Sequence, residues 1–386
     1  MRILVAGGDG YIGWPLTVKL AAEHPEAEIV VADNFTRRQL VASQGAESVV
    51  PVASMDRRLA ALRNVVGQER VRFCEVDLSS DAVDRLIRQF QPQLIYHLAQ
   101  IPSASFSMSC PEASLRTIVN NECSNMGLLW AVRRHCPDAH IVKLGSFGEY
   151  CKAGIDIGEG YFTPEYLGKT PTRPMPFPRE ADDVYHITKI NDSNFVSLAC
   201  RKWGLRITDV MQSTVFGVGI PQTMAHADLF TRFDYDTFFG TVLNRFVVQA
   251  AAGHDLTVYG TGHQRTGLMA LVDAIDSLHN LGFDVPPKAT HRVINHVTEK
   301  HYSINDIADL VVAAGERRRL AVKVVREVHN PRQEFEARKP QYNIESHYVD
   351  QLRPALIESV VDEAFRVVLD FRDRINLDLL TPKQAW

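Results

Sequence analysis

Short apolar runs alternate with longer mixed segments along the first half of the chain. The runs Ile3–Ala6 and Ile29–Ala32 each hold four consecutive apolar residues, which is typical of a strand buried on both faces. The segments between such runs are long enough for crossover helices, so the pattern predicts an α/β fold built on a doubly wound parallel sheet. Further strands are expected at 71–76, 94–98, 140–144 and 206–211.

Three glycines follow the first predicted strand at a spacing of three residues: Gly7, Gly10 and Gly13. Glycine allows a sharp turn, a close ligand and close packing of helix on strand, and the N–H groups of the helix that follows suit a pyrophosphate. Asp33 follows the second apolar run directly. In a dinucleotide-binding fold, a carboxylate at this position accepts hydrogen bonds from the hydroxyls of the adenosine ribose. Together these features predict a Rossmann-type domain that binds NAD. An ordinary βαβ unit with a solvated aspartate is the alternative.

The choice between NAD and NADP depends on charge. The carboxylate of Asp33 would repel a 2′-phosphate, whereas Arg37 and Arg38 could attract one, and we expect NAD. Residues at the ends of later strands are expected to contact the adenine and the nicotinamide half. The residues expected to contact the cofactor are Gly7, Gly10, Tyr11, Ile12, Gly13, Asp33, Asn34, Arg37, Arg38, Asp77, Leu78, Leu98, Ala99, Tyr185 and Lys189.

The pattern changes after about residue 255. Short predicted strands at Leu256–Tyr259 and Arg292–Asn295 alternate with predicted helices around Ile304–Ala314 and Leu356–Leu369. This alternation predicts a smaller C-terminal α/β lobe that packs across the cofactor domain and binds the substrate.

Two domains are therefore expected. Residues 1–215 would form the NAD-binding Rossmann domain with the catalytic residues, and residues 216–386 would form mainly the substrate-binding lobe, although the chain could cross back to the first domain. Two irregular segments, 154–179 and 217–236, are expected to be loops over the site.

Composition and charge limit the kinds of molecule that this protein could bind. The chain has 386 residues, of which 45% are hydrophobic, and a formal net charge of −4 without any block of Lys and Arg, which argues against nucleic acid or a membrane surface. No apolar run approaches the roughly 18 residues that span a bilayer, and a strand is predicted directly after Met1, so we expect a cytoplasmic protein without a signal peptide. The six cysteines lack metal-ligand spacing, so no metal site is expected.

A tyrosine and a lysine lie four residues apart in the segment from Asp183 to Lys189, which places Tyr185 and Lys189 on one face of a predicted helix. A fixed ammonium would lower the pKa of the phenol and make it a better general base. Ser146, at the end of a predicted strand, could hold the substrate hydroxyl and the phenol in one network. A Tyr-x-x-x-Lys pair alone is frequent by chance, but the combination with the glycine turn and Asp33 favours catalysis.

In this order the motifs resemble those of the extended short-chain dehydrogenases/reductases, which include NAD-dependent nucleotide-sugar epimerases and dehydratases. One branch, the UDP-sulfoquinovose synthases, is most similar. The stretches that carry this resemblance are GGDGYIGW (7–14), DNFTRR (33–38), VKLGSFGEY (142–150), YHITK (185–189), RFDYDTFFGTVLNRFVVQAAAGHDLTVYG (232–260) and NPR (330–332).

The resemblance implies a reaction and a substrate class. Tyr185 would take the proton of the sugar 4-hydroxyl while a hydride passes from C4 to NAD, and the resulting ketone would acidify C5. In the synthases, loss of water across C5 and C6 would then give an enone to which sulfite adds. His186 would lie near C6 or the incoming sulfur nucleophile. The resemblance also implies a UDP-linked or other nucleotide-linked sugar as substrate, and a homodimer.

The substrate motifs depart from the family pattern. The 4,6-dehydratases of this family carry an acidic pair just after the catalytic Ser or Thr, where this chain has Phe147 and Gly148, and Glu149 is not assumed to replace them. The synthase branch places an arginine soon after its strand-end histidine, whereas the segment after His97 contains no cation. The resemblance places five residues at the substrate: Gln100, Gln212, Tyr259, Arg265 and Arg332.

Three functions remain open from the sequence. The first is an enzyme like UDP-sulfoquinovose synthase. The second is a relative that oxidises C4 of a nucleotide sugar, or a related alcohol, and then epimerises or eliminates without sulfite. The third is a non-catalytic NAD-binding regulator, which is disfavoured because nothing in a binding role requires Ser146, Tyr185 and Lys189 together.

Overall fold

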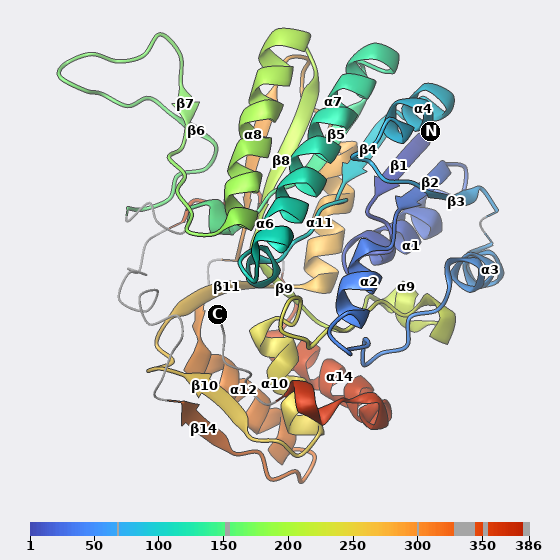
Figure 1. Ribbon diagram of the computed structural model, residues 1–386, viewed down its shortest axis with the longest axis vertical. Helices are drawn as coiled ribbons and strands as arrows, with labels where there is room; N and C mark the ends of the chain where they lie inside the picture. Colours follow the sequence, from blue (N-terminus) through green and yellow to red (C-terminus); the bar gives the residue numbers. More distant parts are fainter. Residues whose placement is uncertain (68, 151–154, 299–300, 328–343, 350–353, 381–386) are drawn as a thin grey trace.

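A computed structural model describes residues 1–67, 69–150, 155–298, 301–327, 344–349 and 354–380 (Figure 1). Its centre is a seven-stranded sheet in the order β12-β8-β5-β4-β1-β2-β3, in which every neighbouring pair is parallel. The strands are β1 (Arg2–Ala6), β2 (Glu28–Asp33), β3 (Val71–Glu75), β4 (Leu94–His97), β5 (His140–Leu144), β8 (Arg206–Gln212) and β12 (His291–His296). The predicted doubly wound sheet and its first six strands are confirmed.

Helices cover both faces of this sheet (Figure 1). On one face α1 (Gly13–Glu23) and α11 (Leu271–Phe283) share a core with the strands, and α3 (Met55–Val66) packs beside them. On the other face lie α4 (Ala82–Phe90), α7 (Ser124–His135) and α8 (Val184–Trp203). Strand order reverses between β1 and β4, and in such sheets the ligand site lies outside the carboxyl ends at this point.

The core of the C-terminal lobe is continuous with buried side chains of the first domain, among them Leu40 and Ile101. Its helices α10 (Val242–Ala251), α12 (Ile304–Glu316) and α14 (Ile357–Asp370) bury Leu243, Val311 and Phe365 against one another. Two small sheets complete it, formed by β10 (Leu256–Tyr259) with β14 (Val324–Glu327), and by β13 (His301–Ser303), β11 (Arg265–Ala270) and β9 (Thr214–Phe216).

One strand expected in this lobe lies elsewhere. The segment Arg292–Asn295 belongs to β12, which pairs with β8 and forms the edge of the large sheet. Helix α11 also packs on the large sheet, so the chain crosses back to the first domain before it returns to the lobe. Local apolar alternation predicts a strand but does not specify its partner, which is why the sequence placed this strand in the wrong sheet.

Short elements connect these layers. The described parts of the two segments expected to be loops, 155–179 and 217–236, contain only brief regular structure. The short elements are α2 (Thr36–Ala42), α5 (Ala104–Ser107), α6 (Pro111–Ile118), a π-helical turn (Val119–Cys123), β6 (Tyr161–Phe162), β7 (Met175–Pro176), α9 (Pro221–Met224) and 3₁₀ turns at 147–150, 227–229, 372–374 and 377–379. In the part of the chain that the structure describes, no helix combines the length and apolar character needed to cross a membrane.

Candidate active site

A cavity of about 570 Å³ lies at the carboxyl ends of the central strands and is lined by both the large sheet and the C-terminal lobe. All four predicted catalytic residues, Ser146, Tyr185, His186 and Lys189, line it. The predicted cofactor residues that line it are Gly7, Gly10, Tyr11, Ile12, Gly13, Asp33, Asn34, Arg37, Asp77, Leu78, Leu98, Ala99, Tyr185 and Lys189. Arg38 is not among the lining residues.

The glycine turn leaves no room for side chains. Gly7 has a φ of 84°, and a Cβ built on it would lie 2.6 Å from the backbone carbonyl of Leu98. A Cβ on Gly13 would collide with the carbonyl of Gly7. The backbone therefore faces the cavity directly at the N-terminus of α1, where N–H groups and the helix dipole favour an anion such as a pyrophosphate.

Asp33 is held rigidly at the end of β2. Its two carboxylate oxygens accept hydrogen bonds from the backbone N–H groups of Asp9 (2.9 Å) and Phe35 (2.7 Å). Burial and the carboxylate of Asp9 raise the pKa of Asp33, and the two N–H donors oppose this rise. The carboxylate thus stands at the cavity wall in the place that the ribose of a dinucleotide requires.

The two nearby arginines are held by acidic partners. Arg37 donates to Asp234 at 2.9 and 2.7 Å, and Arg38 donates to both oxygens of Asp9 at 2.7 and 2.6 Å. Arg58, which is fully buried, donates to the same Asp9 at 2.8 Å. The positive charge that could attract a 2′-phosphate is already paired, so the residues present fit NAD rather than NADP.

Tyr185 and Lys189 lie one turn apart at the start of α8. The Nζ atom of Lys189 lies 5.8 Å from the centre of the Tyr185 ring and donates hydrogen bonds to the carbonyl of Leu144 at 2.6 Å and to the side-chain oxygen of Gln100. The Gln100 amide in turn donates to Asp192. Burial and the ammonium of Lys143 lower the pKa of Lys189. Gln100, expected at the substrate, thus holds the lysine in place.

Ser146 lies between Tyr185 and His186. Its Oγ atom is 3.1 Å from Nε2 of His186, whose Nδ1 is 2.6 Å from Oδ2 of Asp183. Because a carboxylate only accepts, Nδ1 carries the proton and Nε2 is free to accept from the serine hydroxyl. Burial raises the pKa of Tyr185, and a hydrogen bond with Ser146 opposes that rise. His186 thus joins Ser146 and Asp183 in one hydrogen-bonded row, which lies beside the phenol of Tyr185.

Gly148 makes this row possible. A Cβ at this position would collide with Nε2 of His186. The neighbouring Glu149 does not supply the missing acid, because it is fully buried and accepts from Arg179 at 2.8 Å and from the backbone N–H of Ser146 at 3.0 Å. Phe147 and Gly148 line the cavity, whereas Glu149 does not.

The predicted substrate residues are not all brought together. Gln100, Gln212 and Arg265 line the cavity. The Oε1 atom of Gln212 lies 2.7 Å from Nδ1 of the buried His296. Tyr259 is in β10 but is not among the lining residues. Arg332 lies outside the described residues.

Several residues in or beside the site were not predicted from the sequence. Asp183 could have been found, since an aspartate three residues before a histidine at a helix start is typical of an N-cap. Asn121 carried no local signal: the π-helical turn brings it to Ile101 N–H (2.8 Å) and to the hydroxyl of Thr188 (3.0 Å). Such turns occur often at functional sites. Ser124, the first residue of α7, also lines the cavity.

Comparisons with known proteins identify the family of this chain. The model of the NAD dependent epimerase/dehydratase family matches residues 3–281. The chain is 34% identical to the chloroplastic UDP-sulfoquinovose synthase of Spinacia oleracea over 389 residues, which covers all of this chain and 79% of that one. It is also 34% identical to the UDP-sulfoquinovose synthase of Sulfolobus acidocaldarius over 393 residues, covering all of this chain and 98% of that one.

Solved structures show the same fold at low identity. The UDP-glucuronic acid 4-epimerase of Bacillus cereus, in complex with UDP-glucuronic acid and NAD, superposes with a TM-score of 0.68 at 17% identity, covering 96% of this chain and 99% of that one. The UDP-glucose 4-epimerase of Thermotoga maritima gives a TM-score of 0.67 at 16% identity, with 95% and 98% covered. The chain belongs to the NAD dependent epimerase/dehydratase family of extended short-chain dehydrogenases/reductases, and it is an enzyme that uses NAD.

Proposed function

We propose that this enzyme oxidises C4 of a UDP-linked sugar and carries the product through a reaction of the UDP-sulfoquinovose synthase type. One observation carries the proposal: Ser146, Tyr185, His186 and Lys189 meet in the same cavity as the glycine turn and Asp33. The two synthases that match the whole chain support the substrate class.

The residues have distinct roles in the opening step. NAD, when bound, accepts a hydride from the sugar carbon and later returns it. Tyr185 takes the proton of the 4-hydroxyl as general base, and Ser146 orients that hydroxyl. Lys189, fixed by Leu144 and Gln100, keeps a positive charge beneath the phenol ring and favours its ionised form.

We assign His186 and Asp183 a role in removing the proton from the Tyr185 hydroxyl, which turns the tyrosine into a base. Burial opposes ionisation of Tyr185, so its proton needs an acceptor. The tyrosine can donate to Ser146 while the serine donates to Nε2 of His186, and the resulting imidazolium faces the Asp183 carboxylate at 2.6 Å. Moving one proton along this row leaves a tyrosinate in the cavity and an ion pair behind it.

A second candidate is the same oxidation without sulfite. Among the described residues lining the cavity, the arginines and lysines are Arg37, Lys189 and Arg265. The first is paired with Asp234, the second is held by Gln100, and Arg265 donates to the carbonyl of His301 at 3.1 Å. Arg37 is thus paired with a carboxylate, Lys189 is committed to the base, and Arg265 already bonds a carbonyl, which supports an outcome such as epimerisation that needs no sulfite.

The assembly and the location are further parts of the proposal. Residues 1–215 would bind NAD, and residues 216–386 would mainly bind the sugar nucleotide.

A cytoplasmic location is supported by the free state of the five described cysteines, which is typical of a reducing compartment. A homodimer is supported by the exposed apolar residues Leu115, Val119 and Ile187 on the adjoining α6, π-helical turn and α8.

The nucleotide-sugar assignment is tested by product analysis. Purified enzyme would be incubated with UDP-, dTDP- and GDP-linked sugars, with and without sulfite or thiosulfate, and the products read by mass spectrometry. We expect a UDP-linked sugar to exchange its 6-hydroxyl for a sulfonate when sulfite is present. A product that forms equally well without sulfite would establish the second candidate, and no product from any nucleotide sugar would refute both.

Replacing Tyr185 with Phe should abolish the internal redox step. Loss of a general base typically costs about 10² to 10⁴ in rate, whereas the fold and NAD binding should be nearly unchanged because only a hydroxyl is removed. Single-turnover absorbance of reduced NAD would report the step, and calorimetry with NAD would serve as the control. Turnover within tenfold of wild type would exclude Tyr185 as the base.

Changing Asp183 to Asn should lower kcat by about 10- to 100-fold with little change in KM, a range typical for losing the carboxylate that orients a histidine. Asparagine is as good an N-cap as aspartate, so α8 should still start in the same place. The exposed neighbour Asp182 offers a matched control, because Asp182→Asn removes the same charge without touching His186. Equal rates for both variants would remove His186 and Asp183 from the mechanism.

The homodimer is tested at Leu115, whose residue is 63% exposed on α6. Leu115→Asp places a charge in the apolar surface and should shift the mass measured by light scattering from two chains to one. Leu167→Asp, at an 83% exposed position in a distant loop, should leave the mass unchanged. A wild-type protein that runs as a monomer at micromolar concentration would contradict the proposal.

A further inference from the structure

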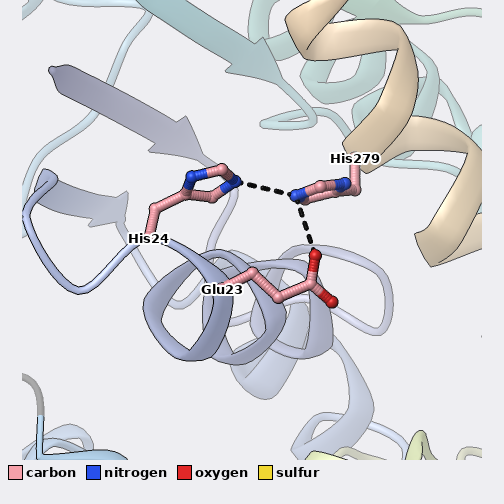
Figure 2. A group of neighbouring side chains, drawn as sticks. All are labelled: Glu23, His24 and His279. Carbon is pink, nitrogen blue, oxygen red and sulfur yellow. Dashed lines mark hydrogen bonds and ion pairs between the residues drawn. The ribbon is translucent and has the colours of Figure 1, made fainter.

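Three potential metal ligands meet at the end of α1 opposite the glycine turn (Figure 2). Glu23 is the last residue of α1, His24 follows it, and His279 projects from α11. The two Nε2 atoms lie 2.9 Å apart, and Oε2 of Glu23 is 3.2 Å from Nε2 of His279. The helix α1 spans 11 residues, so this cluster lies about 16 Å from the cofactor end of the helix.

The spacing of these atoms matches the first shell of a tetrahedral metal. A Zn–N distance of about 2.1 Å and tetrahedral angles put neighbouring ligand atoms about 3.4 Å apart. The separations of 2.9 and 3.2 Å are slightly shorter than this value, and all three ligand atoms lie within 4.8 Å of one another. Two imidazoles and one carboxylate suit Zn²⁺, Ni²⁺ or Cu²⁺, whereas Mg²⁺ and Ca²⁺ prefer oxygen ligands.

Surrounding groups hold the ligands in orientation. Nδ1 of His279 lies 3.1 Å from the side-chain oxygen of Asn280, so a proton on Nδ1 leaves Nε2 as the ligand atom. Lys19 donates to Oε1 of Glu23 at 2.5 Å and to Asp276 at 3.0 Å, which turns Oε2 toward the histidines.

Packing and backbone charge also favour a cation here. The His24 ring stacks on Phe283, with ring centres 4.3 Å apart, and the His279 ring lies 5.0 Å from the same phenyl group. The cluster lies at the C-terminus of α1 and in the last turns of α11, where helix carbonyls carry partial negative charge. The side chain of His279 is only 12% exposed, while Glu23 at 39% leaves a route from solvent.

We propose that Glu23, His24 and His279 bind one divalent transition-metal ion, with water at the open fourth position, and that the ion ties α1 to α11. The two histidines are 255 residues apart in the chain, so the ion would join the beginning of the cofactor domain to the helix that follows β11. The cluster lies at the end of α1 that is far from the glycine turn and the cavity. The ion would therefore stabilise the fold rather than take part in the reaction.

The test uses untagged full-length protein, stripped of metal with a chelator and dialysed. Thermal unfolding would be followed with ZnCl₂, NiCl₂ or MgCl₂ added, and calorimetry with Zn²⁺ would give the stoichiometry. We expect one Zn²⁺ per chain and a rise in Tm of about 3 °C or more at saturating Zn²⁺, because a ligand that binds only the folded state stabilises it. Mg²⁺ should give no rise.

Matched variants separate this cluster from other histidines. His279→Gln and His24→Gln should each weaken Zn²⁺ binding at least tenfold and abolish most of the rise in Tm. His347→Gln, which changes a histidine whose side chain is 73% exposed elsewhere, should keep both. Absence of a Zn²⁺-dependent rise in the wild type, or an equal rise in the His279 variant, would overturn the proposal.

Discussion

A buried ion pair between Lys143 and Asp209 underlies the whole catalytic arrangement. Lys143 on β5 lies 3.1 Å from Asp209 on β8, and the hydroxyl of Ser193 on α8 donates to the same aspartate at 2.5 Å. Burial alone would raise the pKa of Asp209, but the Lys143 ammonium outweighs it and holds that pKa far below its usual range. Losing either partner would leave an uncompensated buried charge, at a cost of about 3 to 5 kcal/mol. The pair joins β5 to β8, and Ser193 ties α8, the helix that carries Tyr185 and Lys189, to both of its members.

The fold was largely predictable because its signals are local. Apolar runs, the glycine turn and Asp33 each follow from backbone sterics or burial within a few residues, and they located six strands of the large sheet. What the sequence could not specify was partnership over long distances. The strand Arg292–Asn295 has the same local pattern in either sheet, and only the pairing of β12 with β8 settles its place.

The site shows the same division. Tyr185, Lys189 and Ser146 were found because their types and spacing carry a known chemistry. The partners of Lys189 were not, since Gln100 and the carbonyl of Leu144 reach it from distant segments. Lys143 and Asp209 stand inside apolar strands, where a charged residue gives no hint of its partner in the sequence. The arginines at 37 and 38 were ambiguous for the same reason, because their acidic partners lie in other segments of the chain.

Gly148 has a consequence for how this family can diversify. The position that an acidic residue takes in the dehydratases is, in this chain, the space into which His186 extends. The same space cannot hold both an acidic side chain at position 148 and the imidazole of His186, so a protein that gains one must lose the other. A lineage could not pass between the two arrangements by one substitution without an intermediate in which the imidazole is displaced. The absence of a side chain at Gly148 therefore determines whether this scaffold carries the histidine or the acidic residue of the dehydratases.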